Sequence, residues 1–209
     1  MKNQQLRSLF AKVLLLLLVL FTTTPAFAIE PIQTLILPLV DTAGLSDAAT
    51  TQIIHDTLKQ PFKYPYYSLL PATAGQQAAQ AYIPANKTAR LTDEQSLSKI
   101  AKDLSADLVI VVELQKFRLN RSFSFWQDDE TYVDSDIVLK CYAYSALSKR
   151  YDSFEAVKYD HEPESIYTNT SVIFKDLTQQ LLTKLPYKRI PLAGFTKPDT
   201  AKEAIAQAL

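Results

Sequence analysis

The middle of this chain alternates apolar and polar residues over two long stretches, and this period of two constrains its fold more than any other feature. From residue 114 onward, one side of the first stretch carries Phe117, Leu119, Phe123 and Phe125. In residues 132–145, one side carries Val133, Ile137, Leu139, Cys141 and Ala143. Such alternation is typical of half-buried strands, so we predict a long antiparallel hairpin with one apolar face.

The pairing of the two strands follows from the numbering of these residues. Both apolar sets are odd-numbered, and directly opposed positions in a ladder have a constant sum, so the turn should contain an odd number of residues. The opposite face then brings Lys116 and Arg118 within reach of Asp134 and Asp136. Such exposed pairs are each worth only about 0.2–1 kcal/mol, so they set the register more than the stability.

The segments around the hairpin predict an α+β fold, with one mixed sheet and helices packed on it. Leu108–Val112 is continuously apolar, which indicates a central strand covered on both faces. Ser46 is expected to cap a helix over 46–59, and Thr92 and Gln95 to form a capping box for the next clear helix. Shorter strands are expected at 35–40, 66–70 and 151–159, a helical tendency at 72–90 and a last helix at 164–185. The predicted order is β-α-β-α-β-β-β-α.

The first 28 residues have the three-part layout of a secretory signal peptide. A basic start without acids is followed by the apolar run 13–21 and by Ala26-Phe27-Ala28. We predict cleavage after Ala28 and export to the periplasm or the exterior. No lipid anchor is expected because no cysteine lies near the cleavage point, and no transmembrane segment should remain after cleavage. The mature chain is predicted to hold one domain, 29–186, and a tail, 187–209, that can end in a short helix.

Several functional classes are excluded by composition. The only glycines are Gly44, Gly75 and Gly194, too far apart for a dinucleotide fingerprint, a phosphate loop or a nucleophile elbow. The 22 basic and 22 acidic residues balance, so nucleic acid is not expected as a partner. Two histidines and one cysteine are too few for disulfide frameworks or zinc fingers. We therefore expect no cofactor, no metal and no enzyme activity.

Four polar features could indicate catalysis or metal binding. Cys141 is interpreted as a small buried hydrophobe, the alternative being a thiol nucleophile activated by His55 or His161. The acids around His161 suit the start of the last helix, and the spacing lacks the second histidine of a zinc motif. His55 is expected on the surface or half-buried. The acidic residues of 128–136 are interpreted as a solvated turn and strand face rather than as a calcium site.

Aromatic side chains around the hairpin are the most suggestive candidates for a contact surface. Phe123, Phe125 and Trp126 stand at its predicted tip, and Tyr132, Tyr142 and Tyr144 line the face predicted to point outward. Exposed aromatics supply large contact areas at modest entropic cost. The alternative is that the two phenylalanines extend the core and that a helix or the tail covers the tyrosines.

The order of elements also resembles a known group of domains. The Leu37-Pro38 end of the first strand and the entry Ser105-Ala106-Asp107 into the central strand, followed by a meander and a closing helix, are similar to the amino-terminal domain of TolB. CsgG-like and LpoB-like envelope proteins share that shape. The resemblance covers residues 33–186 and implies an envelope domain used for protein contacts or assembly, without catalysis.

Two functions are consistent with these sequence features. The first is an exported, non-catalytic module that binds a protein or cell-wall component through the hairpin. The second is an exported hydrolase with a site built from carboxylates or Cys141. A pocket lined by acids with raised pKa values would support the hydrolase, and a flat surface with an aromatic patch would support the binding module.

Overall fold

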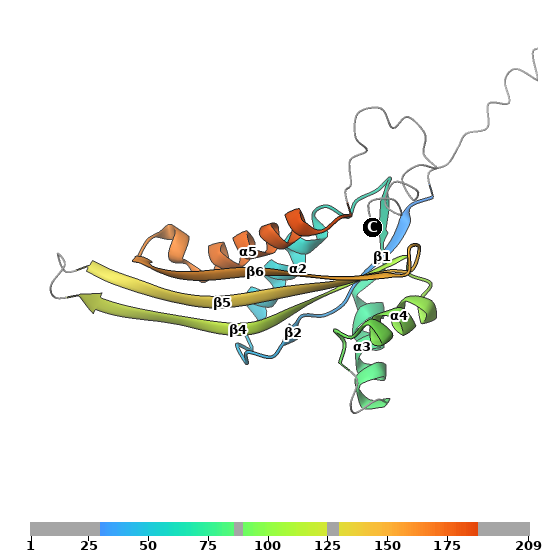
Figure 1. The fold of residues 1–209 in the computed structure, drawn as a ribbon, viewed down its shortest axis with the longest axis horizontal. Coiled ribbons are helices and arrows are strands. Elements are labelled where there is room, and N and C mark those ends of the chain that lie inside the picture. Colours follow the sequence, from blue (N-terminus) through green and yellow to red (C-terminus); the bar gives the residue numbers. More distant parts are fainter. Residues whose placement is uncertain (1–29, 86–89, 125–129, 188–209) are drawn as a thin grey trace, which may run out of the picture.

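Three long antiparallel strands dominate the molecule (Figure 1). They are β4 Leu108–Ser124, β5 Glu130–Ser145 and β6 Arg150–Pro163. The computed structural model describes residues 30–85, 90–124 and 130–187. The predicted meander is confirmed, and β6 is longer at both ends than the strand predicted at 151–159.

Shorter parallel strands complete the mixed sheet beside β4. The order is β3-β1-β4-β5-β6, with β1 at Ile32–Ile36 and β3 at Tyr67–Leu69. A two-residue strand, β2 Val40–Asp41, pairs with β4 further along the edge that β1 occupies. Pro38 lies in the gap between β1 and β2, as expected for a residue that cannot donate a ladder hydrogen bond.

The helices cover the two faces of the sheet unequally (Figure 1). Helix α2, Ala48–Lys59, and helix α5, Thr170–Lys184, lie side by side on one face. Helix α3, Ala72–Ala85, and helix α4, Glu94–Asp103, pack on the other face, against β1 and the adjoining parts of β4 and β5. Strands β3 and β4 flank β1 on opposite sides, so right-handed connections place α2 and the α3–α4 pair on opposite faces.

Each face of the sheet has its own hydrophobic core. The α2–α5 side buries one row of β4, Leu108, Ile110, Val112 and Leu114, against Phe174 and its neighbours. The α3–α4 side buries Val109 and Val111 of the same strand. Leu108–Val112 is thus covered on both faces, as predicted. Gly75 allows α3 to approach β1 closely, since a Cβ there would lie 3.0 Å from the Ile36 carbonyl oxygen.

The hairpin register agrees with the prediction at the tip and departs from it at the base. Ser124 pairs with Glu130, which leaves residues 125–129, an odd number, between them. A bulge at Gln115 then shifts the pairing, so Leu114 opposes Leu139 whereas Lys116 opposes Val138. The prediction that the numbers of opposed residues have one constant sum along the whole hairpin is therefore wrong. The bulge has a physical reason: Leu114 and Phe117 are three residues apart, and only an extra residue lets both face the same core.

Two predicted helix caps are wrong. Asp47, not Ser46, caps α2: its carboxylate accepts from the amides of Ala49 and Thr50, whereas Ser46 has φ 48°. A charged acceptor suits the positive end of the helix dipole better than a hydroxyl. The box expected from Thr92 and Gln95 does not form, because α4 begins after Asp93 and the Thr92 carbonyl accepts from the Tyr151 hydroxyl at 2.7 Å.

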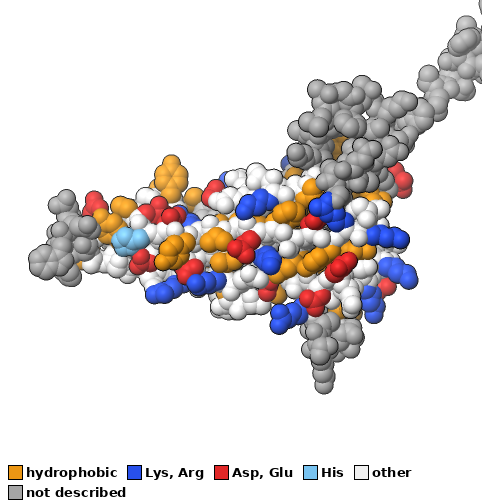
Figure 2. Space-filling view, viewed as in Figure 1, with side chains coloured by type: hydrophobic (Ala, Val, Ile, Leu, Met, Phe, Trp, Pro, Cys, Tyr) orange, Lys and Arg blue, Asp and Glu red, His pale blue; other side chains and the backbone are white. Residues whose placement is uncertain are grey.

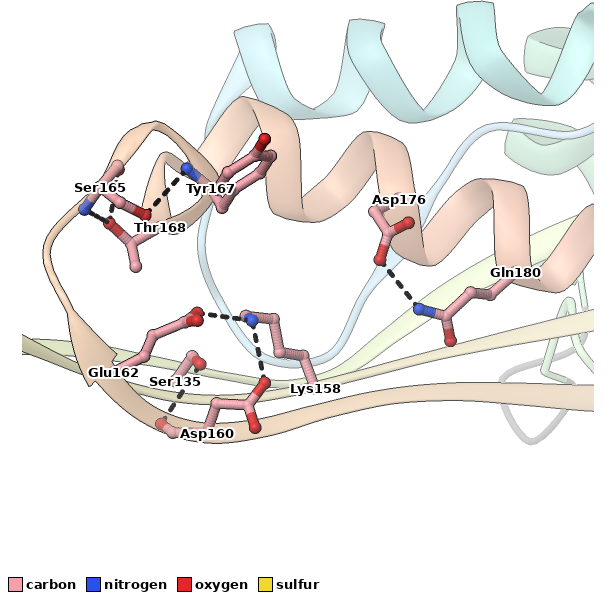
Figure 3. Close-up of polar contacts among 9 residues, drawn as sticks. All are labelled: Ser135, Lys158, Asp160, Glu162, Ser165, Tyr167, Thr168, Asp176 and Gln180. Atoms are coloured by element: carbon pink, nitrogen blue, oxygen red, sulfur yellow. Dashed lines mark hydrogen bonds and ion pairs between the residues drawn. The ribbon is translucent and has the colours of Figure 1, made fainter.

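The start of the last helix also differs from the prediction. Residues up to Pro163 continue β6, and a 3-10 turn, η1 Ile166–Thr168, separates them from α5. The capping box belongs to this turn and joins Ser165 to Thr168 (Figure 3). Asn169 then caps α5 by accepting from the Ser171 amide at 3.0 Å.

The predicted leader, residues 1–28, and the tail from residue 188 onward lie outside the described residues. No helix among the described residues is long and apolar enough to span a membrane.

Candidate functional site

The α3–α4 layer ends before the hairpin does, so among the described residues no helix lies over the distal part of this sheet face. We call this surface the open face. Three rows cross it from β4 through β5 to β6: Lys116–Val138–Val157, Arg118–Asp136–Tyr159 and Asn120–Asp134–His161. A fourth row, Ser122–Tyr132–Pro163, lies next to the tip. Apolar and charged side chains alternate along this part of the molecule (Figure 2).

The apolar part of the open face lies on β5 and the edge strand β6. Val138 and Val157 oppose each other, and Tyr159 follows two residues further along β6. Tyr159 is 79% exposed and Val157 is 46% exposed, whereas Ile137 and Leu139 on the reverse face are completely buried. Exposed apolar side chains that adjoin one another on a rigid strand are a recognised mark of a contact surface.

Tyr132 and His161 lie at the end of the open face that is nearest the hairpin tip. Their rings stack, and Nδ1 of His161 contacts Oδ1 of Asp134 at 2.5 Å. Asp134 is the direct ladder partner of His161, so this contact joins side chains of β5 and β6. His161 is therefore part of a strand surface, and the prediction that it lies at a helix start is wrong.

The charged rim of the open face runs along β4. Lys116 and Asp136 form the predicted cross-strand ion pair, with Nζ 2.5 Å from Oδ2. Arg118 is directly opposite Asp136, and Asn120 is opposite Asp134. The predicted meeting of these cations and acids is confirmed, with the ion pair made by Lys116.

The other predicted aromatic residues are not together on this face. Phe123 is 50% exposed and lies on the α5 side of the sheet, in line with Phe117 and Leu119. Tyr142 and Tyr144 are each only 8% exposed because α4 covers them. Phe125 and Trp126 lie outside the described residues. Of the predicted contact residues that the structure describes, Tyr132 alone lies on the open face.

Sequence reasoning missed Tyr159 and Val157. The odd positions of β6 carry Ser153, Glu155, Val157, Tyr159 and His161, which is polar at one end and apolar or aromatic at the other. This gradient along one face was the available signal, and a simple test for alternation does not detect it.

Cys141 is completely buried among the side chains of the α2–α5 core. Burial raises its thiol pKa to about 12. A nucleophilic cysteine needs an accessible thiolate at neutral pH, so the interpretation of Cys141 as a small core residue is confirmed. His55 is half-buried on α2, as predicted, and burial together with Lys59 lowers its pKa.

Charged side chains and a hydrogen-bonded carbonyl oxygen along the outer edge of β6 discourage pairing with another strand. Lys158 points to the α5 side and forms ion pairs with Asp160 at 2.9 Å and Glu162 at 2.7 Å (Figure 3). The Lys184 ammonium donates to the carbonyl oxygen of Glu155. Inward-pointing charges and occupied carbonyls protect a sheet edge, so the face of β6 is better suited to contacts than its edge.

No protein-family model matches the sequence, and no curated protein matches it. Among solved structures, lipoprotein GNA1162 from Neisseria meningitidis is 12% identical, with a TM-score of 0.41 over 73% of this chain and 99% of that one. The hypothetical protein CT253 from Chlamydia trachomatis is 9% identical, with a TM-score of 0.45 over 74% and 95%.

The LpoB C-terminal domain from Salmonella enterica is 11% identical, with a TM-score of 0.38 over 68% of this chain and 90% of that one. A lipoprotein and the LpoB C-terminal domain are therefore among the solved structures to which this chain is distantly similar. The likeness to TolB and CsgG stays a prediction. All of these similarities are too distant to transfer a function.

Proposed function

We propose that this chain is an exported, non-catalytic envelope module that binds a protein partner through the open face. The leader pattern of residues 1–28 supports export, and sequencing of the envelope form is expected to give Ile29 as its first residue. Recovery of an intact amino terminus would contradict the predicted cleavage of the leader.

The observation that carries the binding proposal is that exposed apolar side chains of β6 lie on a backbone held in place by the sheet. Tyr159 and Val157 belong to a three-stranded ladder, so their backbones are fixed before any partner arrives. A preformed surface of β-branched and aromatic residues loses little conformational entropy on binding. The alternating charges of Lys116, Asp136 and Arg118 beside it would orient the partner more than hold it.

The alternative function, an exported hydrolase, has no specific observation in its favour. Its thiol candidate, Cys141, is buried. No group of three or more His, Cys, Asp or Glu side chains arranged to hold a metal ion occurs within the part of the chain that the structure describes.

Site-specific photocrosslinking tests the open face. A photoreactive phenylalanine analogue at Tyr159 should crosslink one partner from the native envelope, whereas the same analogue at Tyr167 should not. Tyr167 is a matched control, because it is also a strongly exposed tyrosine, at 67%, and lies in η1, off the open face. Equal crosslinking at the two positions, or none at Tyr159, would contradict the proposal.

A further inference from the structure

A cavity of about 970 Å³ lies beside the open face, between α3, the β1–β2 connection and β4. Its walls are mainly apolar and include Leu39, Val40, Ala79 and Leu91. Glu113 and Gln115 of β4 also line it. A volume of several hundred Å³ with apolar walls and few polar groups is typical of sites for small organic ligands.

Neutral donors hold the Glu113 side chain in place. Its Oε2 accepts from the Tyr142 hydroxyl at 2.8 Å and from Nε2 of Gln115 at 2.9 Å. Burial and the hydrogen bond to Glu113 raise the pKa of Tyr142, so its hydroxyl remains a donor at neutral pH. The carboxylate is therefore oriented before any ligand arrives.

The second carboxylate oxygen of Glu113, a half-buried residue, has one long contact from the described residues. Oε1 lies 3.3 Å from the Thr42 hydroxyl, but that hydroxyl has one hydrogen and lies closer, at 2.9 Å, to the Leu114 carbonyl oxygen. No ion pair involves Glu113 among the described residues. Arg90 also lines the cavity, but its side chain is exposed to solvent and makes no ion pair with Glu113.

We propose that this cavity binds an organic cation, with an amine donating to Oε1 of Glu113 and an apolar body against Leu39, Val40, Ala79 and Leu91. The charge of Glu113 favours a positive group, and its Oε1 can accept a hydrogen bond from that group. The apolar walls call for a hydrocarbon portion larger than the amine itself.

Three probes with the same hydrocarbon portion separate the contributions: 4-phenylbutylamine, 4-phenylbutanol and 4-phenylbutanoate. In titrations of the full chain followed by NMR, we expect the amine to bind at least about tenfold more tightly than the alcohol, with shifts centred on Val40 and Glu113. The carboxylate should bind most weakly.

Two variants complete the test. In Glu113→Gln, which keeps an acceptor for Tyr142 and Gln115, the advantage of the amine over the alcohol should disappear. In Gln76→Trp, which places a large ring on the exposed cavity wall of α3, both probes should lose affinity. A preference for the carboxylate, an amine advantage that survives in Glu113→Gln, or shifts centred elsewhere in the wild-type protein would overturn the proposal.

Discussion

Tyr132 and His161 stack face to face on neighbouring strands, with ring centroids 4.9 Å apart and an angle of 7° between the rings. They are diagonal neighbours, because His161 opposes Asp134 and Tyr132 opposes Pro163. Diagonal aromatic contacts help to fix the register of two strands. The stack therefore stiffens the distal end of the open face, where the α3–α4 layer gives no support.

Replacing His161 by Ala should weaken partner binding more than folding. The imidazole and the Asp134 carboxylate are both about half exposed, so the loss of their contact and of the stack should lower the free energy of unfolding by only about 0.2–1 kcal/mol. Urea denaturation measures the stability, and the crosslinking yield at Tyr159 measures binding. A loss of several kcal/mol would mean that the pair supports the fold instead.

Two substitutions at Tyr142 should differ sharply in their effect. Tyr142→Phe keeps the buried ring and removes the hydroxyl, which donates to Glu113 and accepts from Nε2 of Gln115, so we expect a loss of about 1–2 kcal/mol. Tyr142→Ala also removes the buried ring and should cost about 3–5 kcal/mol. Equal, small losses in urea denaturation would contradict the burial of this side chain.

The hairpin was predictable from sequence because period-two alternation over a dozen residues has few alternative structures. The bulge was harder to predict. One extra residue exchanges the odd- and even-numbered positions between the two faces of β4. Because Leu108–Val112 is apolar at every position, the sequence does not show which of these positions face which core. The burial of Tyr142 and Tyr144 depends on where α4 packs, and this tertiary contact cannot be seen in the local sequence pattern. The acids near His161 suit a helix start and an exposed strand equally well, so composition alone could not decide between them.

Deleting Gln115 should damage the fold far more than substituting it. Without the extra residue, the distal half of β4 would turn Phe117 away from Phe174, on which its ring stacks at 5.8 Å. We expect a loss of about 3–5 kcal/mol, as for removal of a core phenylalanine. Gln115→Ala keeps the bulge and should cost less than about 1 kcal/mol. Circular dichroism and urea denaturation compare the two variants, and a mild effect of the deletion would contradict the role of the bulge.

Removing the charge of Lys158 should promote self-association. Lys158→Ile deletes the inward-pointing ammonium that pairs with Asp160 and Glu162 beside the β6 edge. The variant should form larger species than the wild-type protein at equal concentration, measured by light scattering, with little change in unfolding free energy. Lys175→Ile, on the exposed surface of α5, is the matched control. Equal association of the two variants would point to general hydrophobicity instead of the edge.

The buried thiol of Cys141 should make the fold sensitive to alkali. Its pKa rises from 9.0 to about 12 in the folded chain, so between these values the unfolded chain releases a proton that the folded chain keeps. Stability therefore falls as the pH rises through this window. Cys141→Ala should be less stable at pH 7 because of the cavity it leaves, but its stability should fall less steeply above pH 9. Urea denaturation from pH 7 upward measures both slopes, and parallel slopes would show that the thiol ionises alike in both states. Iodoacetamide provides a second check, since it should label Cys141 only after unfolding.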